Sequence, residues 1–550
     1  MKSKYRMIII LMLLGLLTLS LSVFGEGNKS ISLPEEAKVP QINYWITSQT
    51  YDPVRYEIGL MVAEKWKELG FDVKTTCLEW ATMSSKGMKA HEHDVFMIQW
   101  GGKAERIDPF HWLYTLHHSS EAASGKYNVA GYENPEYDKL AEGFVTNTDL
   151  EKRREYAFKM QEILAHDVPQ PPIVHRVVTH AYNKDDFENV VMAMGEGLNS
   201  FWNWINITPK GDRKILKYGY VGDIKLLNPL TTKTGADIYI LNIIYDPLIR
   251  IDVNGKPQPW AAESYKQIDE RTVEVVLRDN MKFHDGTPVT VDDVKYTFDL
   301  AKEVKAPYYS SKIKYLKEVK IVDNKTLRFV LVEPFAPFIS NGLALVGILP
   351  KHIWEKQYIE KGAEGLLNWD NQPPIGSGPF KFGYWRPNEE LKLVKNDEHF
   401  NPPKIEGLVR IPYAQAYGVV QGLKAKEIDG SGWSLLPLQI EEVKDARHLS
   451  LGRIDDQGYY MLHYNLRVAP FDDINIRRAL TYAIPKKKIV QLIFEDLAVP
   501  AYSVVAPVNK FWHNPGIEKV GDNIEKAKSI LEESGFRWDI DGHIYYPENY

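Results

Sequence analysis

The sequence contains almost no cysteine. Cys77 is the single thiol in 550 residues, so a disulfide framework and a multi-thiolate zinc or iron–sulfur site are both excluded. The sequence also lacks an excess of basic charge, because 67 Lys and Arg stand against 73 Asp and Glu, for a net charge of -6. Without such an excess the chain has no positive surface to follow a phosphate backbone, and nucleic acid is not expected as a partner.

Recognisable catalytic motifs are missing as well. A Walker A loop, HExxH, CxxC and the GxSxG nucleophile elbow are all absent from the sequence. His91 and His93 form the strongest metal candidate, because alternate residues of a strand share one face. The string 91–94 is nevertheless better explained as a solvated turn before the apolar strand 95–98. We therefore expect no metal site, no cofactor and no enzyme, a profile typical of a binding protein.

A long apolar run occurs at the start of the chain. A basic segment with Lys2 and Lys4 precedes apolar residues 7–23, and Val23-Phe24-Gly25 offers small residues for signal peptidase. We predict that residues 1–25 are a cleaved signal peptide, with an uncleaved membrane anchor as the alternative. No cysteine follows the run, so the exported protein is expected to be periplasmic or extracellular and not a lipoprotein.

The composition that is present is that of a globular protein. Hydrophobic residues make up 44% and charged residues 25% of a chain too long for one compact core. Residues 52–70 have the caps and apolar face of a helix, and residues 71–77 alternate as a strand. Thr148 with Glu151 forms a capping-box pattern that opens a further helix. Alternating helices and strands predict α/β lobes.

Several sequence blocks resemble a known family. Residues 259–265 and 272–278 read PWAAESY and TVEVVLR, and residues 281–289 read MKFHDGTPV. These blocks closely resemble the signature region of the dipeptide- and oligopeptide-binding proteins of ABC transporters, solute-binding family 5. Residues 374–380 (PIGSGPF) and 470–479 (PFDDINIRRA) resemble the same family.

The resemblance implies a two-lobed α/β fold of the type II periplasmic-binding-protein class, with a ligand cleft between the lobes. Members of the family close their lobes around a peptide, an oligosaccharide or a metal complex and deliver it to a membrane permease. Closure would bury the ligand, so its hydrogen bonds would be shielded from water.

The blocks stand in an unusual order for this family. The usual opening, Leu-x-Pro-Leu, lies at residues 227–230, and the usual carboxy-terminal half lies at about residues 40–210. Residues 541–548 resemble what should precede residues 41–45. We interpret this order as a circular permutation; a piece cut from a tandem array and an assembly error are the alternatives. We then expect residues 44–47 and 543–546 to lie close in space.

This interpretation predicts the domain boundaries. Lobe one would be one continuous stretch, residues 186–452. Lobe two would be built from both ends of the chain, residues 40–185 and 453–550. In peptide-binding members of the family, the strand that ends near Trp100 supplies backbone partners, and an Asp shortly after it meets the ammonium group of the peptide.

The chain departs from the family pattern at that point. Residues 99–109 read QWGGKAERIDP, which is longer than the common form and places cations near the expected carboxylate. Asp108 either anchors the ammonium group or caps the helix that follows Pro109. Lys103 and Arg106 either bind a ligand carboxylate or are solvated loop charges.

Further ligand-binding candidates follow from the resemblance. Thr234 and Gly235 would form the first strand-to-helix turn, where a missing Cβ allows close backbone approach. Tyr464 and Asn465 would lie on a cleft strand of lobe two. Tryptophans are candidates for stacking on the ligand. The full set is Trp100, Gly101, Lys103, Asp108, Trp112, Thr234, Gly235, Trp385, Trp433, Tyr464 and Asn465.

These observations predict an extracytoplasmic receptor of an ABC importer, monomeric, with a peptide ligand and a membrane permease as partners. An oligosaccharide receptor on the same fold is the first alternative, because the chain is rich in tryptophan. A nickel-complex receptor, an exported hydrolase that uses carboxylates, and a chaperone for unfolded peptides also remain open.

Overall fold

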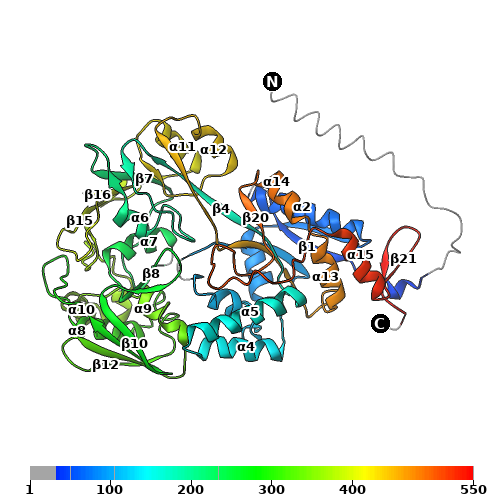
Figure 1. Ribbon diagram of the computed structural model, residues 1–550, viewed down its shortest axis with the longest axis horizontal. Coiled ribbons are helices and arrows are strands. Elements are labelled where there is room, and N and C mark those ends of the chain that lie inside the picture. Colours follow the sequence, from blue (N-terminus) through cyan, green and yellow to red (C-terminus); the bar gives the residue numbers. More distant parts are fainter. Residues whose placement is uncertain (1–32, 50, 104–105, 233, 549–550) are drawn as a thin grey trace.

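The computed structural model describes residues 33–548 except 50, 104, 105 and 233 (Figure 1). The predicted signal peptide at residues 1–25 lies outside them. A large mixed sheet with the strand order β14-β15-β16-β7-β17-β4-β19-β3-β1-β2 runs through the molecule, and β18 and β20 both pair with β4. Helices alternate with these strands along the chain, so the predicted α/β class is confirmed.

One end of the large sheet, with its helices, forms the part that we call the β3 half, residues 33–171 and 456–548. Its strands β1 and β2 are parallel, and β3 runs antiparallel to β19. The strands are β1 (Ile42–Thr47), β2 (Val73–Leu78), β3 (Val95–Trp100), β19 (Tyr459–Tyr464) and β20 (Ala498–Pro500). The helices are α2 (Pro53–Glu68), α4 (Pro135–Thr146), α5 (Leu150–Asp167), α13 (Ile474–Tyr482), α14 (Lys486–Ile493) and α15 (Ile524–Glu533).

Local signals explain why α2 and β2 form where the sequence predicts them. The Asp52 side chain accepts a hydrogen bond from the Arg55 backbone N–H at 2.9 Å, and Pro53 occupies the first helical position. Gly70 has a φ of 92°, a left-handed conformation that favours glycine, and the strand follows directly. At α5 the predicted cap is wrong: Asp149, not Thr148, accepts from the backbone of Glu151 and Lys152.

The rest of the molecule, residues 184–448, is called the β7 half. Its part of the large sheet contains β7 (Ile215–Val221), β14 (Phe380–Arg386), β15 (Glu390–Lys395), β16 (Gly407–Tyr413) and β17 (Gly430–Ser431). The helices that accompany these strands are α6 (Phe201–Asn206), α7 (Gly235–Ile244), α11 (Ala416–Lys424) and α12 (Pro437–Val443).

The β7 half also contains a separate antiparallel sheet of order β10-β11-β13-β12. Its elements are β10 (Ala262–Asp269), β11 (Thr272–Leu277), β12 (Leu316–Ile321), β13 (Thr326–Leu331), α8 (Val291–Glu303), α9 (Gly342–Leu345) and α10 (Lys351–Leu367). The hairpin β8 (Ile249–Ile251) and β9 (Pro257–Pro259) leads into this sheet. In Figure 1 the sheet lies at the lower left, facing α4 and α5 of the β3 half.

Two strands connect the halves. The start of β4 (Pro172–Asn183) pairs with β19 and β20 in the β3 half, and its end pairs with β17 in the β7 half. β18 (Leu449–Asp455) returns beside it, antiparallel, from the Leu449–Asn183 pair to the Asp455–Val177 pair. The halves are therefore joined by a two-stranded ribbon, a geometry suited to a hinge.

The two ends of the described chain meet in the β3 half. The N–H of Val39 donates to the carbonyl of Ile544, and Lys38 forms a bridge with Tyr545 in β22 (Ile544–Tyr545). Residues 544–546 thus lie against the segment just ahead of β1, as expected for two ends that could be joined. Among the described helices, none combines the length and apolar character that a bilayer span requires.

Candidate ligand cleft between the halves

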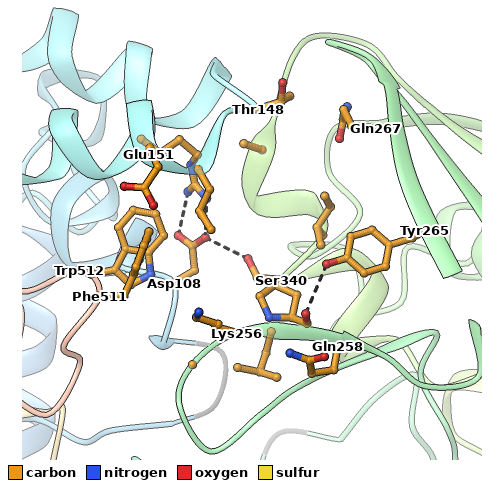
Figure 2. A pocket seen from close by; sticks show the side chains of 17 residues that line it. Asp108, Thr148, Glu151, Lys256, Gln258, Tyr265, Gln267, Ser340, Phe511 and Trp512 are labelled. Carbon is orange, nitrogen blue, oxygen red and sulfur yellow. Dashed lines mark hydrogen bonds and ion pairs between the residues drawn. The ribbon is translucent and has the colours of Figure 1, made fainter.

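A cavity of about 430 Å³, here called the large cavity, lies between the halves (Figure 2). The β3 half contributes the start of α5 and the loop at residues 511–512. The β7 half contributes the β8–β9 hairpin, β10 and residues 336–340. Both halves therefore build one cavity, in the position expected for a ligand that is enclosed by closure.

An ion pair forms one wall of the large cavity. The carboxylate of Asp108 accepts two hydrogen bonds from the guanidinium of Arg153, at 3.0 and 3.1 Å, and its side chain is buried. The Ser340 hydroxyl, from the β7 half, donates to the same carboxylate at 3.1 Å. Figure 2 shows these contacts as dashed lines. Asp108 is thus held by residues on both sides of the cleft.

The same contacts bear on the two interpretations of Asp108. The N–H of Phe110 donates to Asp108 Oδ1 at 3.1 Å, which is the expected capping contact at the start of the turn after Pro109. Because both carboxylate oxygens already accept hydrogen bonds, an incoming ammonium group would have to share Asp108 with Arg153.

The rest of the large cavity combines apolar surface with amide and hydroxyl groups. Ile251, Ile339, Phe511 and Trp512 supply the apolar part. The polar part comes from Gln258, Gln267, Tyr265 and Thr148, with Lys256 and Glu151 as charged residues at the cavity. Such a mixture can bury a ligand and still satisfy its amides or hydroxyls.

A smaller cavity, of about 30 Å³, lies where the end of β3 meets α7. Lys103 lines it from the β3 half, opposite Gly235 and Tyr239 of the β7 half. Thr234 caps α7 by accepting from the Asp237 N–H at 3.2 Å, and a Cβ at Gly235 would meet Tyr239 no closer than 3.8 Å. Of the predicted residues, Lys103 and Gly235 are thus brought together across the cleft.

At the end of β3, the guanidinium group of Arg106 lies over the ring of Trp100. The guanidinium carbon of Arg106 lies 5.0 Å from the ring centroid of Trp100, and Arg106 Nη1 donates to the carbonyl of Gly101 at 2.5 Å. The indole N–H of half-buried Trp100 has no acceptor among the described residues. Burial, and then the charges of Arg106 and Lys103, hold the pKa of His111 well below its usual range.

Some predicted site residues are enclosed in the core. Trp112 is 1% exposed, and its ring lies 5.1 Å from that of Tyr459. Tyr464 is 0% exposed and stacks on Phe471 at 4.8 Å. Asn465 donates to the carbonyls of His91 and His93, so it fixes the turn before β3. These three side chains have almost no surface to offer a ligand.

The remaining tryptophan candidates do not line the large cavity. Trp385 is on β14, the edge strand of the large sheet in the β7 half. Trp433 is 44% exposed and lies 6.1 Å from the ring of Tyr220.

The string 91–94 differs from the predicted solvated turn. His93 is 1% exposed, neither of its ring nitrogens has a hydrogen-bond partner among the described residues, and burial lowers its pKa to about 3. Within the described residues, three potential metal ligands come close together at Asp539, Asp541 and His543, which are distant in sequence from this turn.

Arg153, Ser340 and Trp512 line the large cavity although no sequence pattern points to them. Arg153 stands in the charged run 151–155, where nothing distinguishes a buried arginine from an exposed one. Its partner Asp108 is 45 residues away, and Ser340 is 232 residues from Asp108. Contacts across such separations follow from the fold and leave no local signal.

Comparison with known proteins places the chain in a family. Residues 256–549 match the family described as bacterial extracellular solute-binding proteins, family 5 Middle. The oligopeptide-binding protein AppA of Bacillus subtilis is 29% identical over 329 residues, covering 58% of this chain and 59% of the relative. The dipeptide-binding protein of Escherichia coli is 26% identical over 346 residues, covering 58% and 63%.

Solved structures of similar proteins include AppA of Bacillus subtilis in complex with a nonapeptide, at a TM-score of 0.45 and 26% identity, covering 60% of this chain and 65% of that chain. A periplasmic oligopeptide-binding protein of Thermotoga maritima has a TM-score of 0.49 at 26% identity, with 60% and 66% covered. The chain spans about three fifths of the length of the curated relatives named above. Since the family match covers more than half of its residues, the chain belongs to the bacterial extracellular solute-binding proteins of family 5.

Proposed function

We propose that this chain is the extracytoplasmic substrate-binding protein of an ABC importer, which captures peptides between its two halves and delivers them to a membrane permease. The observation that carries the proposal is the cavity of about 430 Å³ built by both halves. The names of two similar proteins, which are oligopeptide- and dipeptide-binding, support the choice of peptide.

Closure would work through contacts made by both halves. The Ser340 hydroxyl reaches Asp108 across the cleft, and the rings of Phe110 and Phe335 meet edge to face at 5.3 Å. A ligand that touches both walls binds the closed arrangement better than the open one, and this difference in affinity drives closure. In this mechanism the chain acts as a monomeric receptor and not as an enzyme, and it returns its ligand chemically unchanged.

An oligosaccharide is the second candidate ligand. The observation in its favour is the combination of Phe511 and Trp512 with Gln258 and Gln267 in the large cavity, because aromatic faces and amides suit sugar rings and hydroxyls.

The test is mass spectrometry of the protein purified under native conditions from the exported fraction, followed by release and weighing of the bound ligand. A ladder of peptide masses supports the proposal, and hexose-spaced masses favour the second candidate. Incubation of the released ligand with fresh protein checks turnover, since a receptor leaves the masses unchanged. The mass of the intact chain shows whether residues 1–25 have been removed.

The proposal includes the circularly permuted order, with lobe one at residues 186–452 and lobe two at residues 40–185 and 453–550. The pairing of residues 38 and 545 supports it, because the two ends could be joined there without strain. A reordered chain, with residues 212–550 placed before residues 33–211, should fold and bind the same ligand. Its midpoint of thermal unfolding should lie within about 5 °C of the parent chain. A reordered chain that fails to fold would contradict the permutation.

A further inference from the structure

The tip of the β8–β9 hairpin touches the opposite half of the molecule. The hairpin belongs to the β7 half and forms one wall of the large cavity, where Figure 2 shows Lys256 and Gln258. Next to Lys256, the backbone of Gly255 packs on Ile107 of the β3 half. A Cβ built on Gly255 would lie 2.8 Å from Ile107 Cγ2, which is closer than van der Waals contact allows. Any residue other than glycine would therefore collide with the β3 half at this point.

Ile107 is a firm surface for this contact. It is 4% exposed, and its carbonyl accepts a hydrogen bond from Asn509 Nδ2 at 2.7 Å. Asn509 is itself buried, and its backbone N–H donates to the carbonyl of Ala506 at 3.0 Å. The β-branched side chain of Ile107 has little freedom to rotate its γ2 methyl away. A collision at Gly255 would thus push the two halves apart.

The segment 107–110 of the β3 half receives a second loop of the β7 half as well. The Ser340 hydroxyl donates to Asp108 at 3.1 Å, and the ring of Phe335 meets that of Phe110 at 5.3 Å. Ser340 lines the large cavity, as the hairpin does. Two separate loops of the β7 half therefore close the large cavity against one short segment of the β3 half.

The turn that contains Gly255 has a close counterpart elsewhere in the β7 half. Gly255 has a φ of 87°, and its N–H donates to the carbonyl of Asp252 at 3.0 Å. Gly286 has a φ of 91°, and its N–H donates to the carbonyl of Phe283 at 2.9 Å. No atom of the described residues lies within 4 Å of a Cβ built on Gly286. A side chain would strain both turns in the same way, but only at Gly255 would it also meet the other half.

We propose that the β8–β9 hairpin is a lid of the large cavity, and that Gly255 is a positioning residue that lets this lid seat on Ile107 when the halves close. The inference rests on the proposed peptide-binding function and adds the device that retains the ligand. Because Ile107 belongs to the other half, a side chain at position 255 opposes the closed arrangement and leaves the open one unaffected. Such a change lowers ligand affinity through closure alone.

The first experiment compares the two glycines by titration calorimetry. Tetra-alanine with free ends is titrated at pH 7 into the full-length exported protein and its variants. Gly255→Ala should weaken binding by about tenfold or more, since overpacking opposes closure, whereas Gly286→Ala should change the dissociation constant by less than about threefold. Equal effects of the two variants would overturn the inference and leave the peptide function standing.

A double-mutant cycle separates the collision from strain within the turn. In an Ile107→Ala background, which removes the γ2 methyl, Gly255→Ala should change the dissociation constant by less than about threefold. The same loss in both backgrounds would show that Gly255 acts only within its own turn, and the lid would be wrong. Thermal unfolding checks the fold of each variant, and Ile107→Leu, which also lacks the γ2 methyl, replaces Ile107→Ala if the latter unfolds.

The separation of the halves tests the lid without relying on affinity. Spin labels at Ile359→Cys of α10, where the side chain is 78% exposed, and at exposed Lys139→Cys of α4 report this separation by electron resonance, with Cys77→Ser in every protein. The parent should populate a shorter separation that Gly286→Ala keeps and Gly255→Ala loses.

A parent with a single separation, with and without tetra-alanine, overturns the inference, as does a Gly255→Ala distribution equal to that of Gly286→Ala. If the parent binds neither tetra-alanine nor any peptide of a tryptic casein digest, the proposed peptide function fails. The separations measured in the ligand-free protein then still decide whether the hairpin is a lid.

Discussion

The two ends of the cleft use charge differently. In the large cavity, the Asp108 carboxylate accepts from Arg153 within the β3 half and from Ser340 across the cleft. Where the end of β3 meets α7, Lys103 and Glu196 line the small cavity from opposite halves, and Arg106 lies over the ring of Trp100. The comparison teaches that a charged residue in a cleft can serve the fold or the ligand, and that its partners decide which.

The largest expected effect comes from breaking the ion pair between Asp108 and Arg153 in the large cavity. Arg153→Met leaves the buried Asp108 carboxylate without its guanidinium and should lower the free energy of unfolding by about 3–5 kcal/mol. Arg154→Met, the neighbouring change on the more exposed side of α5, should cost less than about 1 kcal/mol, because Arg154 pairs with the exposed Glu151. Urea denaturation followed by circular dichroism measures both. Equal losses would show that the buried pair has no special structural role.

Acid should lower the free energy of unfolding through buried histidines. Burial lowers the pKa of His93 to about 3 and those of His117 and His175 to about 4, whereas an unfolded histidine titrates near 6.5. As the pH falls below about 6.5, these histidines bind protons in the unfolded state but stay neutral in the folded state. The free energy of unfolding should therefore fall by up to about 1.4 kcal/mol per pH unit for each such group, down to about pH 4.

His93→Gln tests this acid sensitivity, because it should make the pH profile shallower by about one proton. An unchanged stability profile in the variant would exclude His93 as a source of the acid sensitivity.

Removal of the Trp100 ring tests its role in ligand binding at the end of β3. Trp100→Ala should weaken ligand binding by about tenfold or more without unfolding the protein, because the ring is half-buried and carries the unpartnered indole N–H. Trp433→Ala removes an exposed ring outside the two cavities described here and serves as the control, with affinity unchanged. Calorimetric titration with the released ligand distinguishes them. Equal affinities for both variants would count against a role for Trp100.

The smallest effect concerns the contact between the halves. Ser340→Ala removes one hydrogen bond to Asp108 but leaves the ion pair with Arg153 in place. It should weaken ligand binding by a few-fold, corresponding to about 1 kcal/mol, through the less stable closed arrangement. Stopped-flow fluorescence should show the change in the rate of ligand release. A release rate equal to that of the parent would mean that this contact does not hold the cleft closed.

Local structure was predictable from the sequence where its causes are local. The cap at Asp52, the proline after it and the glycine at position 70 determine α2 and the start of β2 within a few residues. Lys103 and Gly235, which the family resemblance names separately as ligand-binding candidates, line the same small cavity. The alternating residues 91–94 did not reveal that His93 is buried, because its ring packs beside Trp45 of β1 and Phe96 of β3.

The contacts that define the large cavity could not be predicted. Arg153 belongs to a helix whose charged run gives no sign of which residue faces inward, and Ser340 is an ordinary hydroxyl in a short turn. The contact of Arg153 with Asp108 depends on the packing within the β3 half, and that of Ser340 depends on the relative position of the two halves. A sequence pattern predicts one helix, strand or turn at a time, whereas this site combines side chains from three separate segments.

The pairing of residues 37–39 with residues 544–546 has a practical consequence for observing closure. Fluorescent dyes attached to these two segments would stay at a fixed separation, because both segments belong to the same half. Such a pair would be an internal reference. A second pair, with one dye on α12 and the other on α14, spans the ribbon of β4 and β18 and would report opening and closing against that reference.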